Sequence, residues 1–90
     1  MLRIEVGNRV AKFQARLPPK HRRQIAERII LLASAPDAPD TKALHGSPYR
    51  RADSGEYRIV YEVAGGVLRV VLVGKRNDDE VYRALARLGR

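Results

Sequence analysis

The chain has 90 residues, with 18 Lys and Arg against 10 Asp and Glu, which gives a formal net charge of +8 at pH 7. This length leaves room for one domain, which we expect to span residues 1–90. The sequence contains no cysteine, which excludes a disulfide framework, a thiolate metal site and a cysteine nucleophile. Such a chain is typical of a reducing compartment, so we expect a cytoplasmic protein without a membrane helix.

The basic residues favour a polyanionic partner. The sequence pI is about 10.6, and Arg outnumbers Lys by 14 to 4. Because the planar fork of Arg binds two phosphate oxygens at once, RNA, DNA and an acidic protein are the leading partner classes. A solvated basic surface is the alternative interpretation. Hydrophobic residues make up 44% of the chain and recur periodically, which predicts a folded domain rather than a basic tail.

The first third of the chain predicts a strand followed by two helices. The strand is indicated by apolar residues that alternate with charged ones, namely Leu2, Ile4 and Val6. Asn8 is the expected cap of the first helix, whose apolar stripe consists of Val10, Phe13 and Leu17. Pro18 and Pro19 end that helix. The second helix is predicted over residues 20–34, with inward-facing Ile25, Ile29 and Leu32.

The remaining residues predict a loop, three strands and a final helix. Residues 35–46 have loop composition, and the period of two resumes after Ser47. One face of the strand around residue 60 then carries Tyr57, Ile59, Tyr61 and Val63, while the other carries Arg58, Val60 and Glu62. Gly65-Gly66 predicts a hairpin turn, and residues 67–74 read as a central strand. Asn77 and Glu80 are the expected capping box of a last helix with the apolar stripe Val81, Leu85 and Leu88.

These elements predict an α+β fold in the order β-α-α-β-β-β-α. Short hairpin connections favour a mainly antiparallel, four-stranded sheet, with the two N-terminal helices packed on one face in a two-layer design. The last helix is too short to be stable alone, so its stability must come from packing.

Basic and aromatic residues gather in the C-terminal half of the chain. They are Tyr49, Arg50, Arg51, Tyr57, Arg58, Lys75, Arg76 and Tyr82. The sequence contains only two histidines, His21 and His45, and we expect neither a metal site nor a cofactor. The acidic residues 78–80 are expected to stabilise the last helix by interacting with the positive end of its dipole, rather than to bind a metal.

Several of these segments together resemble the RelE/ParE toxin superfamily of bacterial toxin–antitoxin modules. They are Leu44-His45-Gly46, Tyr49-Arg50-Arg51 and the strand sequence from Gly55 to Val63. The segment Val73-Gly74-Lys75-Arg76, followed by Glu80-Val81-Tyr82, is similar to the RelE branch in particular. Members of that branch cleave messenger RNA in the ribosomal A site. The resemblance spans nearly the whole chain and implies the RelE-like fold.

The resemblance also implies a set of site residues. Arg58 and Arg76 match arginines that engage the scissile phosphate, and Tyr82 matches the C-terminal catalytic tyrosine of the family. The family pattern has a lysine directly after a tyrosine and another two residues later. Here Tyr49 is followed by Arg50, Arg51 and Ala52, and the spacing to Tyr57 is one residue shorter. We therefore expect Arg50 to replace one lysine and Arg51, Lys75 and His45 to contact RNA.

The chemistry of RNA cleavage suits such a site. The ribose 2′-OH is an internal nucleophile, so cleavage needs only its alignment and stabilisation of the charge that develops on the phosphate. Arginines perform the second task but are poor proton donors, which makes Tyr82 the candidate base or orienting group. Packing is the alternative role for Tyr82, and an ion pair with Glu56 or Glu62 is the alternative role for Arg58.

The resemblance implies a toxin that cleaves ribosome-bound mRNA without metal. Its implied partners are an acidic RelB-like antitoxin, the ribosome and mRNA, with operator DNA reached only through the antitoxin and no membrane partner. Two alternatives remain: a ParE-like inhibitor of DNA gyrase, and a catalytically silent member that binds RNA or protein.

Overall fold

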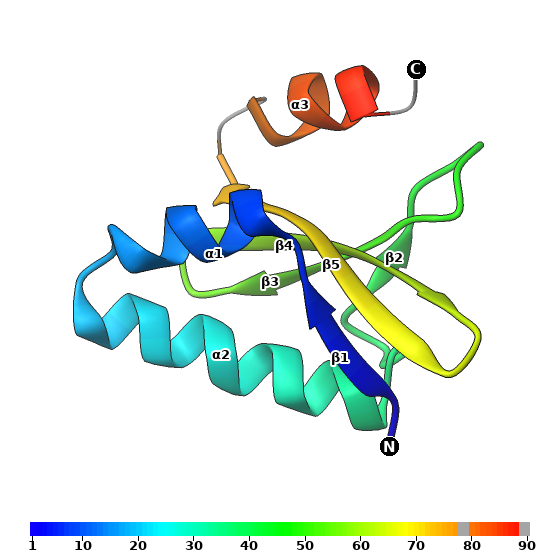
Figure 1. Ribbon diagram of the computed structural model, residues 1–90. Helices are drawn as coiled ribbons and strands as arrows, with labels where there is room; N and C mark the ends of the chain where they lie inside the picture. The colour runs from blue at the N-terminus through cyan, green and yellow to red at the C-terminus, as the bar shows by residue number, and fades with distance from the viewer. Residues whose placement is uncertain (78–79, 89–90) are drawn as a thin grey trace.

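The computed structural model describes residues 1–77 and 80–88 and shows a sheet with helices on both faces (Figure 1). In chain order the elements are β1 (Arg3–Val6), α1 (Asn8–Ala15), α2 (Pro19–Ser34), β2 (Lys42–Ala43), β3 (Arg50–Ser54), β4 (Tyr57–Ala64), β5 (Val67–Lys75) and α3 (Glu80–Leu88). The sheet order is β1-β5-β4-β3-β2. Only the β1–β5 pair is parallel, and the other neighbours are antiparallel. The predicted α+β fold and mainly antiparallel sheet are thus confirmed.

The described sheet has five strands, whereas the sequence predicted four. The additional strand is β2, which lies inside the expected loop and pairs with β3 through two residues, Lys42 with Arg51 and Ala43 with Arg50. Two residues are too few to show an alternating pattern, so periodicity could not reveal this strand.

The N-terminal helices lie close to their predicted positions. Helix α1 begins at Asn8 and is capped by Gly7, so the expected side-chain cap by Asn8 is wrong. The reason is that Gly7 directly follows β1 and its N–H still donates to Val70 O in β5 at 3.3 Å, so the helix begins only after it. Helix α2 begins at Pro19, a position where the missing N–H of proline costs nothing.

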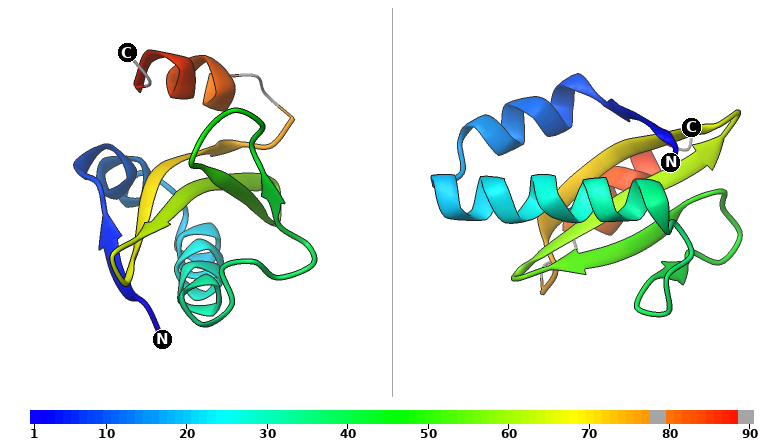
Figure 2. Two further views of the ribbon diagram at one scale, coloured as in Figure 1. Left: turned by 90° about the vertical axis from the view of Figure 1, so that its right-hand side faces the viewer. Right: turned by 90° about the horizontal axis from the view of Figure 1, so that it is seen from below.

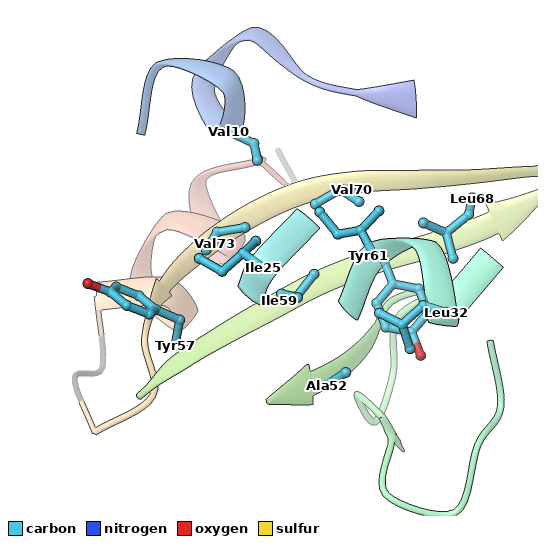
Figure 3. Close-up of a cluster of buried hydrophobic side chains, with 11 residues drawn as sticks. Val10, Ile25, Leu32, Ala52, Tyr57, Ile59, Tyr61, Leu68, Val70 and Val73 are labelled. Atoms are coloured by element: carbon cyan, nitrogen blue, oxygen red, sulfur yellow. The ribbon is translucent and has the colours of Figure 1, made fainter. Parts of the chain in front are cut away.

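One face of the sheet is covered by α1 and α2 (Figures 1 and 2). The apolar cluster between these layers includes the predicted Val10, Ile25, Leu32, Tyr57, Ile59 and Tyr61 (Figure 3). The predicted Ile29 also belongs to it. The ring of Tyr57 meets Phe13 edge-on at 6.0 Å, and the hydroxyl of Tyr61 donates to Pro36 O at 2.5 Å. Both tyrosines are therefore structural.

A β-bulge in β5 distributes apolar side chains to both faces of the sheet. Val60 pairs with Leu72 but Tyr61 pairs with Val70, so Val71 is an extra residue in β5. As a result Val70 and Val73 both contribute to the cluster under α1 and α2, while Leu72 faces the other side. The strand sequence is apolar on both faces because each face packs against one of the two apolar clusters.

Helix α3 lies on the face opposite α2 (Figure 2, left). A second cluster holds it there, formed by Val60, Leu72, Val81 and Ala84. The expected capping box of Asn77 and Glu80, the expected role of residues 78–80 and the side chain of Leu88 fall outside the described part of the chain. None of the described helices is long and apolar enough to cross a membrane.

Candidate functional site

Arg58 is the centre of a polar cluster on the face of the sheet that carries α3. It projects there because its neighbours in β4, Tyr57 and Ile59, point into the cluster under α1 and α2. Its side chain is only 15% exposed. Arg58 Nε donates to Asp53 Oδ1 at 2.9 Å, and Arg58 NH1 donates to the hydroxyl of Tyr82 at 2.6 Å. The guanidinium carbon also lies 5.7 Å from the centroid of the Tyr82 ring.

Asp53 joins the two arginines expected to bind phosphate. It is the cross-strand partner of Arg58 in the β3–β4 register, and its Oδ2 lies 3.8 Å from Arg76 NH1. The hydrogen bond from Arg58 to Asp53 is the main reason that the pKa of Arg58 is raised above its usual value. Burial opposes this effect, and the charge of Asp53 adds to it.

Sequence reasoning missed Asp53, because it considered Glu56 and Glu62 as the partners of Arg58. A signal was present in the turn between β3 and β4. Ser54 pairs with Tyr57 across the two residues Gly55 and Glu56, and Gly55 has a φ of 58°. A two-residue hairpin turn of this kind places Asp53 opposite Arg58.

Arg76 reaches the cluster from the turn after β5. Its backbone N–H donates to Glu56 O at 2.9 Å, which ties this turn to the one between β3 and β4. The Arg76 side chain is 55% exposed, in contrast to the enclosed Arg58. The site thus has one fixed guanidinium and one that faces solvent.

Arg50 lies away from this cluster. It pairs with Tyr61 and shares the α2 side of β3 with the buried Ala52. There Arg50 NH2 donates to Thr41 Oγ1 at 2.8 Å, and its buried Nε has no partner among the described residues. Arg51 is on the opposite side of β3, where it pairs with Val60 and shares the face of Asp53. The structure therefore brings Arg51, rather than Arg50, to the side of Arg58.

Lys75 and His45, the other two expected RNA contacts, lie farther out. Lys75 is exposed at the end of β5 and pairs with Tyr57, which puts it on the opposite face from Arg58. It lines a pocket of about 650 Å³ between α1, β5 and α3, together with Arg9 and Arg87. His45 is exposed in a turn, and neither residue forms a hydrogen bond or ion pair with the described residues Arg58, Asp53 or Tyr82.

The cluster combines groups with distinct chemical abilities. Two permanently charged guanidiniums can bind phosphate oxygens, the carboxylate of Asp53 can accept a proton, and the phenol of Tyr82 can donate one. Across the described part of the chain, no three His, Cys, Asp or Glu side chains gather in a way that suits a metal ion.

A family model described as ParE toxin of type II toxin–antitoxin system, parDE, matches residues 6–80. Among solved structures, the chain is similar to the E. coli toxin RelE, solved as an arginine double mutant in the free state. The two share 28% identity over 96% of each chain, with a TM-score of 0.76. The isolated E. coli RelE toxin gives 24% identity over 98% of this chain and 99% of that one, with a TM-score of 0.75.

An archaeal relative has the same fold. The RelE–RelB complex from Pyrococcus horikoshii OT3 gives 26% identity, a TM-score of 0.74 and coverage of 83% of this chain and 94% of that one. No curated protein sequence matches the chain significantly.

Proposed function

Because the chain belongs to the RelE/ParE superfamily of toxins from type II toxin–antitoxin systems, we propose that it is a ribosome-dependent mRNA endoribonuclease. The observation that carries this proposal is the meeting of three side chains on the α3 face, where Arg58 contacts Tyr82 and shares the carboxylate of Asp53 with Arg76. Three separate elements deliver these side chains to one place, as a site for a single phosphate requires. The proposed enzyme acts in the cytoplasm, where it stops translation by cutting the message in the ribosomal A site.

The proposed reaction uses the nucleophile that RNA itself carries. The 2′-OH attacks the adjacent phosphate, and Arg58 and Arg76 bind its non-bridging oxygens as negative charge develops. Arg51 lies on the same face and supplies the electrostatic support that the sequence assigned to Arg50. Lys75 and His45 are exposed and are proposed to contact the RNA backbone outside the reacting centre.

We propose an acidic RelB-like antitoxin as the natural inhibitor. Solved relatives of this fold include RelE–RelB complexes. The charge of +8 on this chain suits an acidic partner, and the pocket beside α3 combines an apolar lining with Arg9, Lys75 and Arg87. Operator DNA is reached through the antitoxin in this proposal.

The test is cleavage mapping by primer extension in a purified translation system, with and without ribosomes. We expect cuts only on ribosome-bound message. Arg76→Ala should abolish them while leaving the circular dichroism spectrum and melting temperature unchanged, because Arg76 is largely exposed. Arg23→Ala is the matched control, since it removes one exposed charge from α2 on the opposite face of the sheet. Full cleavage by Arg76→Ala would show that this site assignment is wrong.

A second candidate function is inhibition of DNA gyrase, as in the ParE branch. It is favoured by the family model, which is described by the ParE toxin. A gyrase supercoiling assay with the purified protein separates the two functions. Inhibition of supercoiling without mRNA cleavage would favour the second candidate.

A further inference from the structure

Asp53 has a place in the site that phosphate binding alone does not explain. A carboxylate next to a phosphate site repels the substrate, yet Asp53 lies against both proposed phosphate ligands, Arg58 and Arg76. Its side chain is 36% exposed, so it remains accessible to a bound RNA. From this geometry we infer, resting on the proposed nuclease function, that Asp53 is the catalytic base that takes the proton from the attacking 2′-OH.

The three nitrogen atoms of the Arg58 guanidinium fix where Asp53, Tyr82 and a bound phosphate lie relative to one another. Its Nε binds Asp53 and its NH1 binds the hydroxyl of Tyr82. The remaining nitrogen, NH2, lies between these two in the fork and has no hydrogen bond among the described residues. A phosphate oxygen bound at NH2 therefore has the carboxylate on one side and the phenol on the other.

This order matches what an in-line displacement needs. The attacking and leaving oxygens lie on opposite sides of the phosphorus, so the base and the acid must also lie on opposite sides. Asp53 accepts a hydrogen bond from Arg58 and forms an ion pair with Arg76, and its carboxylate oxygens can take up a proton. Tyr82 accepts a hydrogen bond from Arg58, which leaves its own O–H free to donate.

The assignment gives a balanced reaction. The proton of the 2′-OH passes to Asp53 as the bond from O2′ to phosphorus forms. The bond from phosphorus to O5′ breaks, and O5′ takes the phenolic proton of Tyr82. The products are a 2′,3′-cyclic phosphate and a 5′-hydroxyl, and exchange with water returns Asp53 and Tyr82 to their starting states.

A purely structural role for Asp53 makes different predictions. Asp53 could act only by holding Arg58 through the Nε–H bond of 2.9 Å. The variant Asp53→Asn keeps an oxygen that accepts this bond but cannot take up a proton. A loss of general base catalysis typically lowers the rate by about 10²–10⁴-fold. We therefore expect Asp53→Asn to bind RNA at least as tightly as the wild type but to cleave it about 100-fold or more slowly.

The experiment compares two substrates in single-turnover cleavage on programmed ribosomes. One message has the normal oxygen at the scissile position and the other has a bridging 5′-sulfur, which leaves without being protonated. Tyr82→Phe should be slow on the oxygen substrate and close to the wild type on the sulfur substrate. Asp53→Asn should be slow on both, because its defect lies at the 2′-oxygen. Glu56→Gln is the matched control, since it removes a nearby exposed carboxylate that contacts His21 instead.

Each outcome decides one part of the proposal. Near wild-type cleavage by Asp53→Asn, or rescue of this variant by the sulfur substrate, would overturn the role of Asp53 and leave the nuclease function intact. Affinity is measured with a message that carries a 2′-deoxy nucleotide at the scissile position and cannot be cleaved. If Asp53→Asn loses as much affinity for this message as it loses in cleavage rate, its role is structural and the proposal is overturned. Absence of cleavage by the wild type on both substrates would overturn the nuclease function and, with it, the role of Asp53.

Discussion

Arg58 keeps its positive charge under all conditions in which the protein is folded. Its pKa is raised above the usual value of an already strong base, mainly by the hydrogen bond to Asp53. A raised pKa means that the stabilising contribution is complete below the unfolded value and is lost only as the pH rises through the folded one. The ion pair therefore adds no pH dependence from the Arg58 side, and changes of stability in acid must come from carboxyl groups.

Asp40 is a carboxyl group for which such a change is expected. Arg28 on α2 donates to Asp40 at 2.8 Å, and this hydrogen bond holds the pKa of Asp40 below its usual value. Because the folded pKa is lowered, the stabilisation is present above the unfolded pKa, about 3.9, and is lost as the pH falls through the folded value.

The comparison of wild type with Asp40→Asn measures this contribution. We expect the variant to melt slightly lower than the wild type at pH 7, by a small amount because Asp40 is exposed. The difference should disappear as the pH falls below about 4. A difference that persists in acid would assign the effect to something other than the charge of Asp40. Melting followed by circular dichroism at several pH values is the measurement.

Most individual residues of the candidate site could be predicted from the sequence, but their arrangement in space could not. The strand period placed Arg58 on the face away from α1 and α2, and the resemblance connected it with Arg76 and Tyr82. The same period places Arg50 and Arg51 on opposite faces of the sheet, but which of them shares the face of Arg58 follows only from the β3–β4 register. The match to the family pattern started from Tyr49, and Arg50 is the residue directly after it. For this reason the sequence indicated Arg50, while the structure places Arg51 beside the site.

At the scale of elements, the helices and long strands were predictable, whereas the short strand and the β-bulge were not. Helix α2 shows strong periodicity and strand β5 is a nearly continuous apolar run, and both lie within a residue or so of their predicted bounds. The bulge at Val71 and the two-residue strand β2 depend on tertiary pairing, which a local pattern does not contain. The bulge nevertheless matters for function, because it turns Leu72 toward the helix that carries Tyr82.

Gly74 lies directly against Val81 of α3. A Cβ atom at this position would overlap Cγ2 of Val81, which is β-branched and rigid in a helix. We expect Gly74→Ala to push α3 away from β5, at a cost of about 1–3 kcal/mol. Since Arg58 meets Tyr82 only when α3 is docked, cleavage should fall while the cluster under α1 and α2 stays intact.

Hydrogen exchange resolved by residue tests this expectation. In Gly74→Ala the amides of α3 should lose protection, and those of β4 should keep it. Gly7→Ala is the matched control, because a Cβ atom there meets Val70 O at an ordinary contact distance of 3.7 Å. Unchanged protection of α3 in Gly74→Ala would mean that the helix tolerates the added methyl group.

At the scale of the whole molecule, one face of the sheet carries the main apolar core and the other carries the charged cluster. The cluster under α1 and α2 holds most of the fully buried side chains, including Ile25, Leu32 and Tyr61. The opposite face is closed only in part by the nine residues of α3, and beside it lie Arg58, Asp53 and Arg76. This division leaves charged side chains accessible next to a small apolar contact without exposing the main core.

The excess of positive charge and the local site make separate contributions to RNA binding. A long-range field depends on the net charge of +8, whereas a phosphate contact releases a counterion and changes the salt dependence of binding. For single-stranded RNA, one lost contact should reduce the slope of log K against log salt concentration by about 0.7. Arg76→Ala should show this reduction, and Arg23→Ala, with the same net charge, should not. Fluorescence anisotropy with an oligonucleotide carrying a 2′-deoxy nucleotide measures both slopes without cleavage. Equal slopes for the two variants would mean that the whole surface, and not the site around Arg58, binds the RNA.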